Sequence, residues 1–248
     1  MSRKEKLLKN WTESSANYSS SIINELNCFK RQAWLDLILT NAGSDKRMKV
    51  LDVGTGPGFF AILMSLAGHD VTAIDCTQAM INEARSNAEK FGAAVDFRVS
   101  DTQELDFPDE SFDLIINRNV VWTIIDAEKA YREWRRVLRT GGKLLVFDAN
   151  WNIRLFSEEK LREYNRDREE FQRLYPDTPL PYYSDEMEDF RKSMPMCARI
   201  RPQWDFDALI RVGFKRIGCN TDIRELIYDE KEQLLNRSTP MFLLAAEK

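Results

Sequence analysis

The chain has 248 residues, of which 43% are hydrophobic and 31% are charged, and its formal net charge is −4 at pH 7. This length fits a single globular domain with an insertion, and the negative balance disfavours unaided binding to the phosphate backbone of a nucleic acid. No stretch approaches the roughly 18 apolar residues of a membrane-spanning helix, and no apolar signal-peptide run follows the start of the chain.

The four cysteines lie far apart in the sequence, without a Cys-x-x-Cys pair. This usage is typical of a reduced protein with free thiols, so we expect a cytoplasmic location and no metal site. We also expect no nucleic-acid or membrane partner, and either a monomer or a homodimer.

The first 40 residues contain a polar segment and then a helical pattern. Residues 1–20 are polar, with Trp11 and Tyr18 as their only aromatic residues. Apolar residues recur at helical spacing over residues 20–40, which predicts one amphipathic helix that ends at Asn41 and Gly43. Packing of the two aromatic residues on the surface is the simplest interpretation of the polar segment.

The segment Val50–Phe60 reads VLDVGTGPGFF, an apolar strand that runs into a turn with Gly54, Gly56 and Gly58. Glycine permits unusual backbone dihedrals and close approach of a ligand, and the helix that follows offers unpaired N–H groups at its N-terminus. The segment predicts the first half of a βαβ unit. A dinucleotide fingerprint, G-x-G-x-x-G, would place its third glycine where the chain has Phe59, so a dinucleotide oxidoreductase is disfavoured.

An acidic residue follows each of the next two predicted strands. Asp75 ends the strand at residues 71–74, and Asp101 follows the strand at residues 94–99. Ligands of open α/β sheets bind beyond the carboxyl ends of the strands, and a carboxylate can accept hydrogen bonds from two vicinal hydroxyls. A helix N-cap for Asp75, a role that Thr77 also suits, and a plain turn for Asp101 are the alternatives.

The later elements complete an α/β pattern interrupted by an insertion. A tight turn at Gly141 and Gly142 is expected to lead into the fifth strand. Residues 151–204 combine a charged helix with a proline-containing loop and do not continue the strand–helix alternation. The expected elements are helices at 78–91, 126–139, 157–174 and 205–212, and strands at 112–117, 143–147, 215–220 and 240–246.

LDVGTGPG, Asp75, Asp101 and the run RVLRTGGKLLV occur in order over residues 48–148, and together they resemble the class I S-adenosylmethionine (SAM)-dependent methyltransferases that act on small molecules. The resemblance implies a Rossmann-like α/β fold with helices on both faces of a seven-stranded, mostly parallel sheet, in the order 3-2-1-4-5-7-6 with the last strand antiparallel. Within this single domain the implied parts are an N-terminal helical lid (1–42), a SAM-binding core (43–150), a cap insertion (151–204) and a C-terminal helix and hairpin (205–248).

The resemblance also implies the site residues. In the family the glycine loop lies against the amino-acid and ribose parts of SAM, an acid at the position of Asp75 binds the ribose, and an acid at the position of Asp101 binds adenine. The expected cofactor contacts are Asp52, Gly54, Thr55, Gly56, Gly58, Asp75, Cys76, Asp101, Thr102, Asn117, Arg118 and Tyr18. The expected acceptor-pocket residues are Asn119, Trp122, Asn150, Trp151, Tyr182 and Tyr183. Core packing is the alternative for Trp122, and helix packing is the alternative for the two tyrosines.

The implied reaction is transfer of a methyl group from SAM to a small-molecule acceptor by in-line displacement, which leaves S-adenosylhomocysteine. The acceptor atom, nitrogen, oxygen, sulfur or carbon, stays open. A general base is needed only for an acceptor that is protonated at the working pH, and Asp148 and Tyr18 are the candidates. A protein or RNA methyltransferase and a SAM-binding module without catalysis are the alternative functions.

Overall fold

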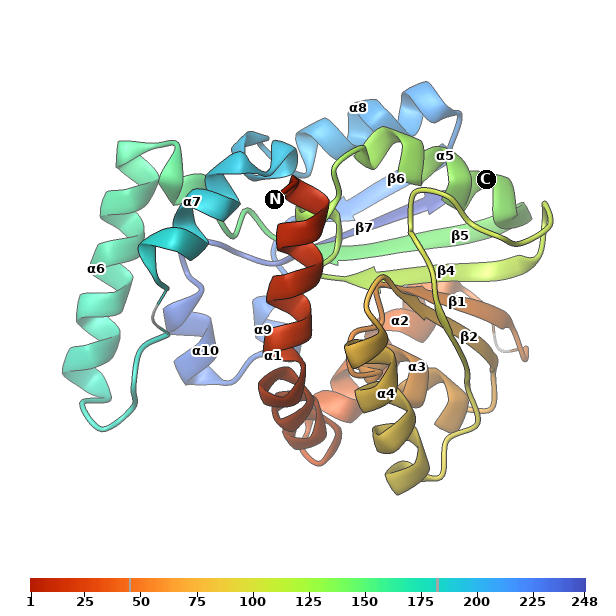
Figure 1. Ribbon diagram of the computed structural model, residues 1–248, viewed down its shortest axis with the longest axis horizontal. Coiled ribbons are helices and arrows are strands. Elements are labelled where there is room, and N and C mark those ends of the chain that lie inside the picture. The colour runs from red at the N-terminus through yellow and green to blue at the C-terminus, as the bar shows by residue number, and fades with distance from the viewer. Residues whose placement is uncertain (45, 182) are drawn as a thin grey trace.

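A seven-stranded sheet forms the centre of the protein, whose computed structural model describes residues 1–44, 46–181 and 183–248 (Figure 1). The strand order is β3-β2-β1-β4-β5-β7-β6. All pairs are parallel except those of β7, which runs antiparallel to both β5 and β6, so the predicted order and direction are confirmed. The strands are β1 (Lys49–Val53), β2 (Asp70–Asp75), β3 (Asp96–Val99), β4 (Phe112–Arg118), β5 (Leu138–Asp148), β6 (Lys215–Asn220) and β7 (Phe242–Glu247).

Helices cover both faces of the sheet, because successive side chains of a buried parallel strand point to opposite faces. Leu145 and Phe147 of β5 pack in the same apolar cluster as α2 (Lys30–Ala42), α3 (Phe59–Leu66) and α4 (Gln78–Phe91). Leu144 and Val146 pack in a second cluster with α5 (Ala127–Val137) and α8 (Gln203–Val212). The near-continuous apolar run of the strand is therefore buried on both sides.

The N-terminal region forms two helices, so the single helix predicted for residues 20–40 is wrong. Helix α1 (Arg3–Leu26) begins with a capping box between Ser2 and Glu5 and includes most of the polar segment. It ends at Asn27, whose side-chain amide donates to the carbonyl of Ile23 at 2.9 Å. Asparagine side chains compete with the helical backbone in this way. The helix α2 then starts after Phe29.

The predicted turn at Gly141 and Gly142 lies inside β5 instead of before it. Phe112 of β4 pairs with Leu138, and Leu114 pairs with Lys143, so the extra residues of β5 form a bulge between the two pairs. A Cβ on Gly142 would lie 2.8 Å from the carbonyl oxygen of Arg139, which leaves no room for a side chain there. The preceding helix consequently ends at Val137 and not at residue 139.

The segments outside the sheet gather beside α1. In Figure 1, α1 crosses the middle of the view, with the sheet on its right and with α6 (Glu158–Leu174) and α7 (Asp185–Ser193) on its left. The predicted connection between β6 and β7 contains the short helices α9 (Arg224–Ile227) and α10 (Glu230–Leu235). No helix in the described part of the chain combines the length and hydrophobicity of a transmembrane segment.

Candidate active site

A cavity of about 350 Å³ lies beyond the carboxyl ends of β1, β2 and β4. This volume is within the range of about 300–1,000 Å³ that is usual for small-molecule sites. Its walls come from the loops that follow these strands and β3, from α1, and from the segment between β5 and α8. The end of α10 and the residues after it complete the walls. The cavity therefore lies where ligands of open α/β sheets bind.

The three glycines of the first loop have different surroundings. Gly54 and Gly56 line the cavity. A Cβ on Gly54 would lie 2.5 Å from Cγ2 of Val120, and one on Gly56 would lie 3.2 Å from the Tyr18 ring, in addition to the strain of a positive φ at both positions. Gly58 does not line the cavity; it is the N-cap of α3 and packs against α4. Two glycines thus border the cavity, and the third permits helix packing.

Asp52 and Thr55 stabilise the glycine loop through hydrogen bonds and do not line the cavity. The Asp52 carboxylate accepts a hydrogen bond from Oγ1 of Thr55 at 2.6 Å and from the backbone N–H of Ala61 at 3.0 Å. Burial raises the pKa of Asp52 to about 7, although both hydrogen bonds act in the opposite direction. The carboxyl group therefore ties the loop to the first turn of α3.

Asp75 reaches the cavity from the end of β2. Its carboxylate accepts hydrogen bonds from the backbone N–H of Gly56 at 3.1 Å and from both the N–H and hydroxyl of Thr77 at 2.9 and 3.0 Å. Burial raises the pKa of Asp75, and these hydrogen bonds oppose the shift. Thr77, not Asp75, caps α4, because its hydroxyl accepts from the N–H of Met80. Cys76 also lines the cavity, and burial raises the pKa of its thiol to about 12.

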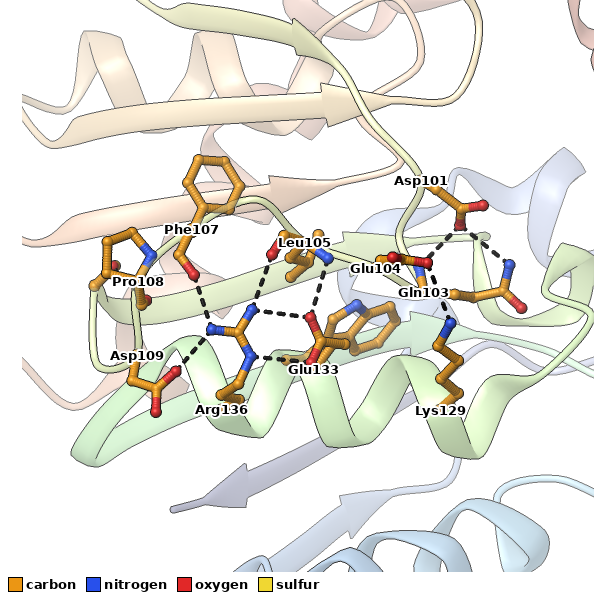
Figure 2. Close-up of polar contacts among 12 residues, drawn as sticks. Asp101, Gln103, Glu104, Leu105, Phe107, Pro108, Asp109, Lys129, Glu133 and Arg136 are labelled. Atoms are coloured by element: carbon orange, nitrogen blue, oxygen red, sulfur yellow. Dashed lines mark hydrogen bonds and ion pairs between the residues drawn. The ribbon is translucent and has the colours of Figure 1, made fainter.

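Asp101 lines the cavity from the loop after β3, which is fastened to α5 (Figure 2). Asp101 accepts hydrogen bonds from the backbone and side chain of Gln103 at 2.9 and 3.1 Å, and from Lys4 of α1 at 2.8 Å. Burial acts to raise the pKa of Asp101, but these contacts outweigh it and leave the pKa below its usual value. Arg136 and Glu133 of α5 hold the same loop through backbone groups between residues 105 and 107.

Arg118 and Tyr18 meet at the bottom of the cavity. Nη1 of Arg118 donates to Oε2 of Glu25 at 2.6 Å, and its guanidinium lies 4.4 Å from the ring centroid of Phe59. Burial acts to lower the pKa of Arg118, but the Glu25 carboxylate outweighs it and raises the pKa above its usual value. Burial raises the pKa of Tyr18. The site floor therefore holds a permanent cation and a neutral phenol at neutral pH.

Two asparagines follow each other closely at the end of β4 but differ in position. Asn119 lines the cavity with φ of 61°, and its Oδ1 is buried without a hydrogen-bond partner among the described residues. Asn117 is fully buried in the strand and does not line the cavity. The structure thus brings the predicted acceptor-pocket residue Asn119 to the cavity, but not the predicted cofactor contact Asn117.

One face of α1 covers the cavity with residues that, apart from Tyr18, were not predicted as site residues. Lys4, Leu7, Leu8 and Trp11 lie at helical spacing and line the cavity together with Tyr18. The rings of Trp11 and Trp122 meet edge to face, with centroids 6.2 Å apart. The helical spacing of these residues could have indicated a face that lines a cavity, but the polar composition of residues 1–20 concealed this pattern. Trp122 and Trp151, two predicted pocket residues, line the same region.

The segment between β5 and α8 contributes a basic, aromatic wall. Its polar and aromatic lining residues include Arg154, Tyr164, Arg168, Tyr183 and Arg191. Of these five residues only Tyr183 was predicted, because Arg168 and Arg191 belong to charged helices that sequence patterns assign to the solvated surface. The predicted pocket residue Tyr182 lies outside the described residues.

Asp148, a predicted catalytic residue, lies beneath the cavity and does not line it. Its carboxylate accepts hydrogen bonds from Arg201 at 2.6 Å, from the backbone of Ala149 at 2.9 Å and from the indole of Trp151 at 3.0 Å. Asn150 also lies outside the cavity lining, because its side chain exchanges two hydrogen bonds with the backbone of Arg201. Both residues therefore support the cavity walls.

Comparisons with known proteins relate the chain to methyltransferases. Residues 51–146 match a family model described as "Methyltransferase domain". Over 115 residues the chain is 35% identical to the uncharacterized methyltransferase YcgJ of Bacillus subtilis, an alignment that covers 46% of this chain and 46% of that protein. The aligned part spans less than half the length of that relative.

Two solved structures share the fold. A SAM-dependent methyltransferase from Aquifex aeolicus is 20% identical, with a TM-score of 0.58 over 92% of this chain and 97% of that one. A phosphoethanolamine N-methyltransferase 2 of Haemonchus contortus, solved with phosphomonomethylethanolamine and S-adenosylhomocysteine, is 16% identical, with a TM-score of 0.60 over 88% of this chain and 52% of that one. At these identities the likeness establishes the fold alone.

Proposed function

We propose that this chain, which belongs to the class I SAM-dependent methyltransferases, transfers a methyl group from SAM to a small-molecule acceptor. The observation that carries the proposal is the gathering of Gly54, Gly56, Asp75 and Asp101 around one cavity at the carboxyl edge of the sheet. The acceptor's lone pair forms the new bond to the methyl carbon while the carbon–sulfur bond breaks. The bonding electrons go to sulfur, so that S-adenosylhomocysteine leaves as a neutral thioether.

The lining residues suit the parts of SAM. We assign the ribose hydroxyls to Asp75, whose carboxylate lines the cavity, and the adenine to the wall formed by Cys76, Asp101 and Thr102. Oδ1 of Asn119 is buried and has no hydrogen-bond partner among the described residues. A buried acceptor of this kind supports binding of the cofactor's ammonium group beside it. The cofactor supplies the reactive methyl group, and the protein supplies position and shielding.

The enclosure of the cavity supports an acceptor of low molecular weight. Residues of α1 form one wall and residues of the 151–204 segment form another, so we assign a lid role to the first and a cap role to the second. Closure aligns the acceptor with the methyl group, and such positioning can contribute about 7–11 kcal/mol to lowering a barrier. Trp122 and Trp11 present aromatic faces and edges that can shield a sulfonium cation. A protein or RNA acceptor would need a more open groove.

Neither predicted base is assigned a proton-transfer role. The carboxylate of Asp148 already accepts hydrogen bonds from Arg201 and Trp151 and lies outside the lining. The raised pKa of Tyr18 keeps its phenol protonated at neutral pH, so we assign it to hydrogen bonding of the cofactor. The reaction we propose therefore suits an acceptor that reaches the site with a free lone pair.

The free thiols of all four cysteines support a cytoplasmic location.

Calorimetric titration of the protein with SAM, S-adenosylhomocysteine and NADH tests the cofactor assignment. We expect SAM and S-adenosylhomocysteine to bind with a stoichiometry of one and NADH not to bind. Binding of NADH without binding of SAM would overturn the proposal and favour a dinucleotide enzyme. Binding of SAM without turnover on any acceptor fraction would instead favour a non-catalytic binding module.

A further inference from the structure

We propose that the methyl acceptor is a small anion with a carboxylate or phosphate group, and that Arg154, Arg168 and Arg191 bind this group. The inference rests on the proposed methyl transfer, because it identifies the acceptor end of the same cavity. All three arginines line the cavity. They come from three separate elements, namely the short helix at Ile153–Leu155, α6 and α7.

The three guanidinium groups converge on two tyrosine rings. Arg154 and Arg168 lie 4.6 and 4.8 Å from the ring centroid of Tyr164. Arg191 lies 3.8 Å from the centroid of Tyr183, and Arg154 lies 6.0 Å from the same ring. Stacking on aromatic faces fixes the orientation of a guanidinium and leaves its N–H edge free to bind two oxygens of an anion. The wall is thus preorganised for carboxylate or phosphate recognition.

The positive charge on this wall exceeds the negative charge that faces it. Arg154 forms an ion pair with Glu188 at 2.6 Å, and its side chain is 6% exposed. Arg168 donates to the carbonyl of Pro181, and neither it nor Arg191 pairs with an acidic side chain within the described ranges. Nε of Arg191 is buried and has no hydrogen-bond partner among these residues. A buried donor without a partner is costly, and an anion would satisfy it.

The cavity's acidic residues and its arginine wall come from different parts of the chain, and its other lining cations, Lys4 and Arg118, are paired with Asp101 and Glu25. Of its acidic lining residues, Asp75 ends β2 and Asp101 lies in the loop after β3. The arginine wall comes from the segment between β5 and α8, and Trp122 and Trp151 line the same cavity. Three neighbouring cations repel one another where water is restricted, so a bound anion stabilises the closed arrangement. We therefore expect a neutral or cationic part of the cofactor beside the two carboxylates, and the anionic acceptor beside the three arginines.

Two anions serve as probes, inorganic phosphate and succinate, each titrated calorimetrically into the protein–S-adenosylhomocysteine complex. The variants are Arg191→Gln and Arg168→Gln, with Arg162→Gln as the matched control, because Arg162 also lies on α6 but is 72% exposed and outside the cavity. We expect at least one anion to bind, with affinity at least 10-fold weaker in the two site variants and unchanged in the control. The preferred probe distinguishes a phosphate-bearing from a carboxylate-bearing acceptor.

Affinity for S-adenosylhomocysteine separates this inference from the proposed function. It should stay within twofold of wild type in all three variants, which also shows that they are folded. Failure of the wild type to bind S-adenosylhomocysteine would refute the proposed function itself. Intact cofactor binding with no anion binding, or with equal anion affinity in the site and control variants, would overturn the inference. Loss of S-adenosylhomocysteine affinity in Arg191→Gln would also overturn it, because the arginine would then hold the cofactor's carboxylate.

Discussion

Arg201 and Asp148 form a buried ion pair that fastens the end of the insertion to the sheet. Nη1 of Arg201 lies 2.6 Å from Oδ2 of Asp148, and neither side chain is more than 1% exposed. Nε of Arg201 also lies 2.8 Å from Asp205 at the start of α8. One cation thus joins the carboxyl end of β5 to α8, directly beneath the cavity wall that carries Trp151.

Removal of this cation should destabilise the fold. Arg201→Ala leaves two carboxylates buried without a counter-charge, so we expect the free energy of unfolding to fall by about 3–5 kcal/mol. Urea denaturation followed by circular dichroism measures the change. Arg199→Ala, at an exposed position two residues earlier, should stay within about 0.5 kcal/mol of wild type. Equal stabilities of the two variants would show that the pair does not secure the insertion.

Asp75 should control cofactor affinity. Asp75→Ala removes the acceptor for the ribose hydroxyls and for the N–H of Gly56, and hydrogen bonds to charged groups contribute about 1.5–3 kcal/mol each. We therefore expect the Kd for SAM to rise at least ~10-fold. Asp70→Ala, at the exposed opposite end of the same strand, serves as the control. An unchanged Kd for Asp75→Ala would remove the ribose assignment.

Asp52 should make stability depend on pH. Its pKa in the folded protein is about 7, above its ordinary value of 3.8. Between these values the unfolded chain has released the proton that the folded chain retains, so the free energy of unfolding falls as pH rises, by up to about 1.4 kcal/mol per pH unit. Above pH 7 this dependence ends.

The variant Asp52→Asn should lose this contribution, because an amide does not titrate. Urea denaturation at several pH values from 4 to 8 compares the two proteins. We expect the stability difference between variant and wild type to grow in favour of the variant up to about pH 7 and then to level off. Parallel curves over the whole range would contradict the raised pKa.

Trp11 should keep the lid over the site. Its ring meets Trp122 edge to face, and such aromatic pairs contribute about 0.5–1.5 kcal/mol beyond their burial. Trp11→Ala should therefore speed S-adenosylhomocysteine dissociation by about 2–10-fold, measured by stopped-flow fluorescence. Thr12→Ala, on the exposed side of α1, should leave the rate unchanged. Identical rates in both variants would argue that α1 does not cover the ligand.

Local patterns predicted most strands, and the family resemblance supplied their order. The residues that line the cavity at the ends of β1, β2 and β3 were predictable because they are close in sequence to these strands. The glycine loop, Asp75 and Asp101 each follow an apolar strand, and parallel strands bring their ends to one edge. Gly58 and Asp52 belong to the same motif, but the structure gives them packing and loop-holding roles that a motif cannot distinguish.

Long-range contacts account for what the sequence did not predict. Asp148 stands at the functional edge like Asp75, but Arg201, far along the chain, occupies its carboxylate. Arg168 and Arg191 resemble solvated helix charges until α6 and α7 fold beside the cavity. Helix α1 ends at Asn27, whose side-chain amide donates to the carbonyl of Ile23, and helical periodicity does not register such a contact.

Release of S-adenosylhomocysteine from SAM, measured with low-molecular-weight, RNA and protein fractions of a cell extract, tests the central claim most directly. The account predicts release with the low-molecular-weight fraction alone, and strong loss of that release in Asp75→Ala. Release only with RNA or protein would contradict the small-molecule assignment. No release with any fraction by a protein that binds SAM would contradict the assignment of catalysis.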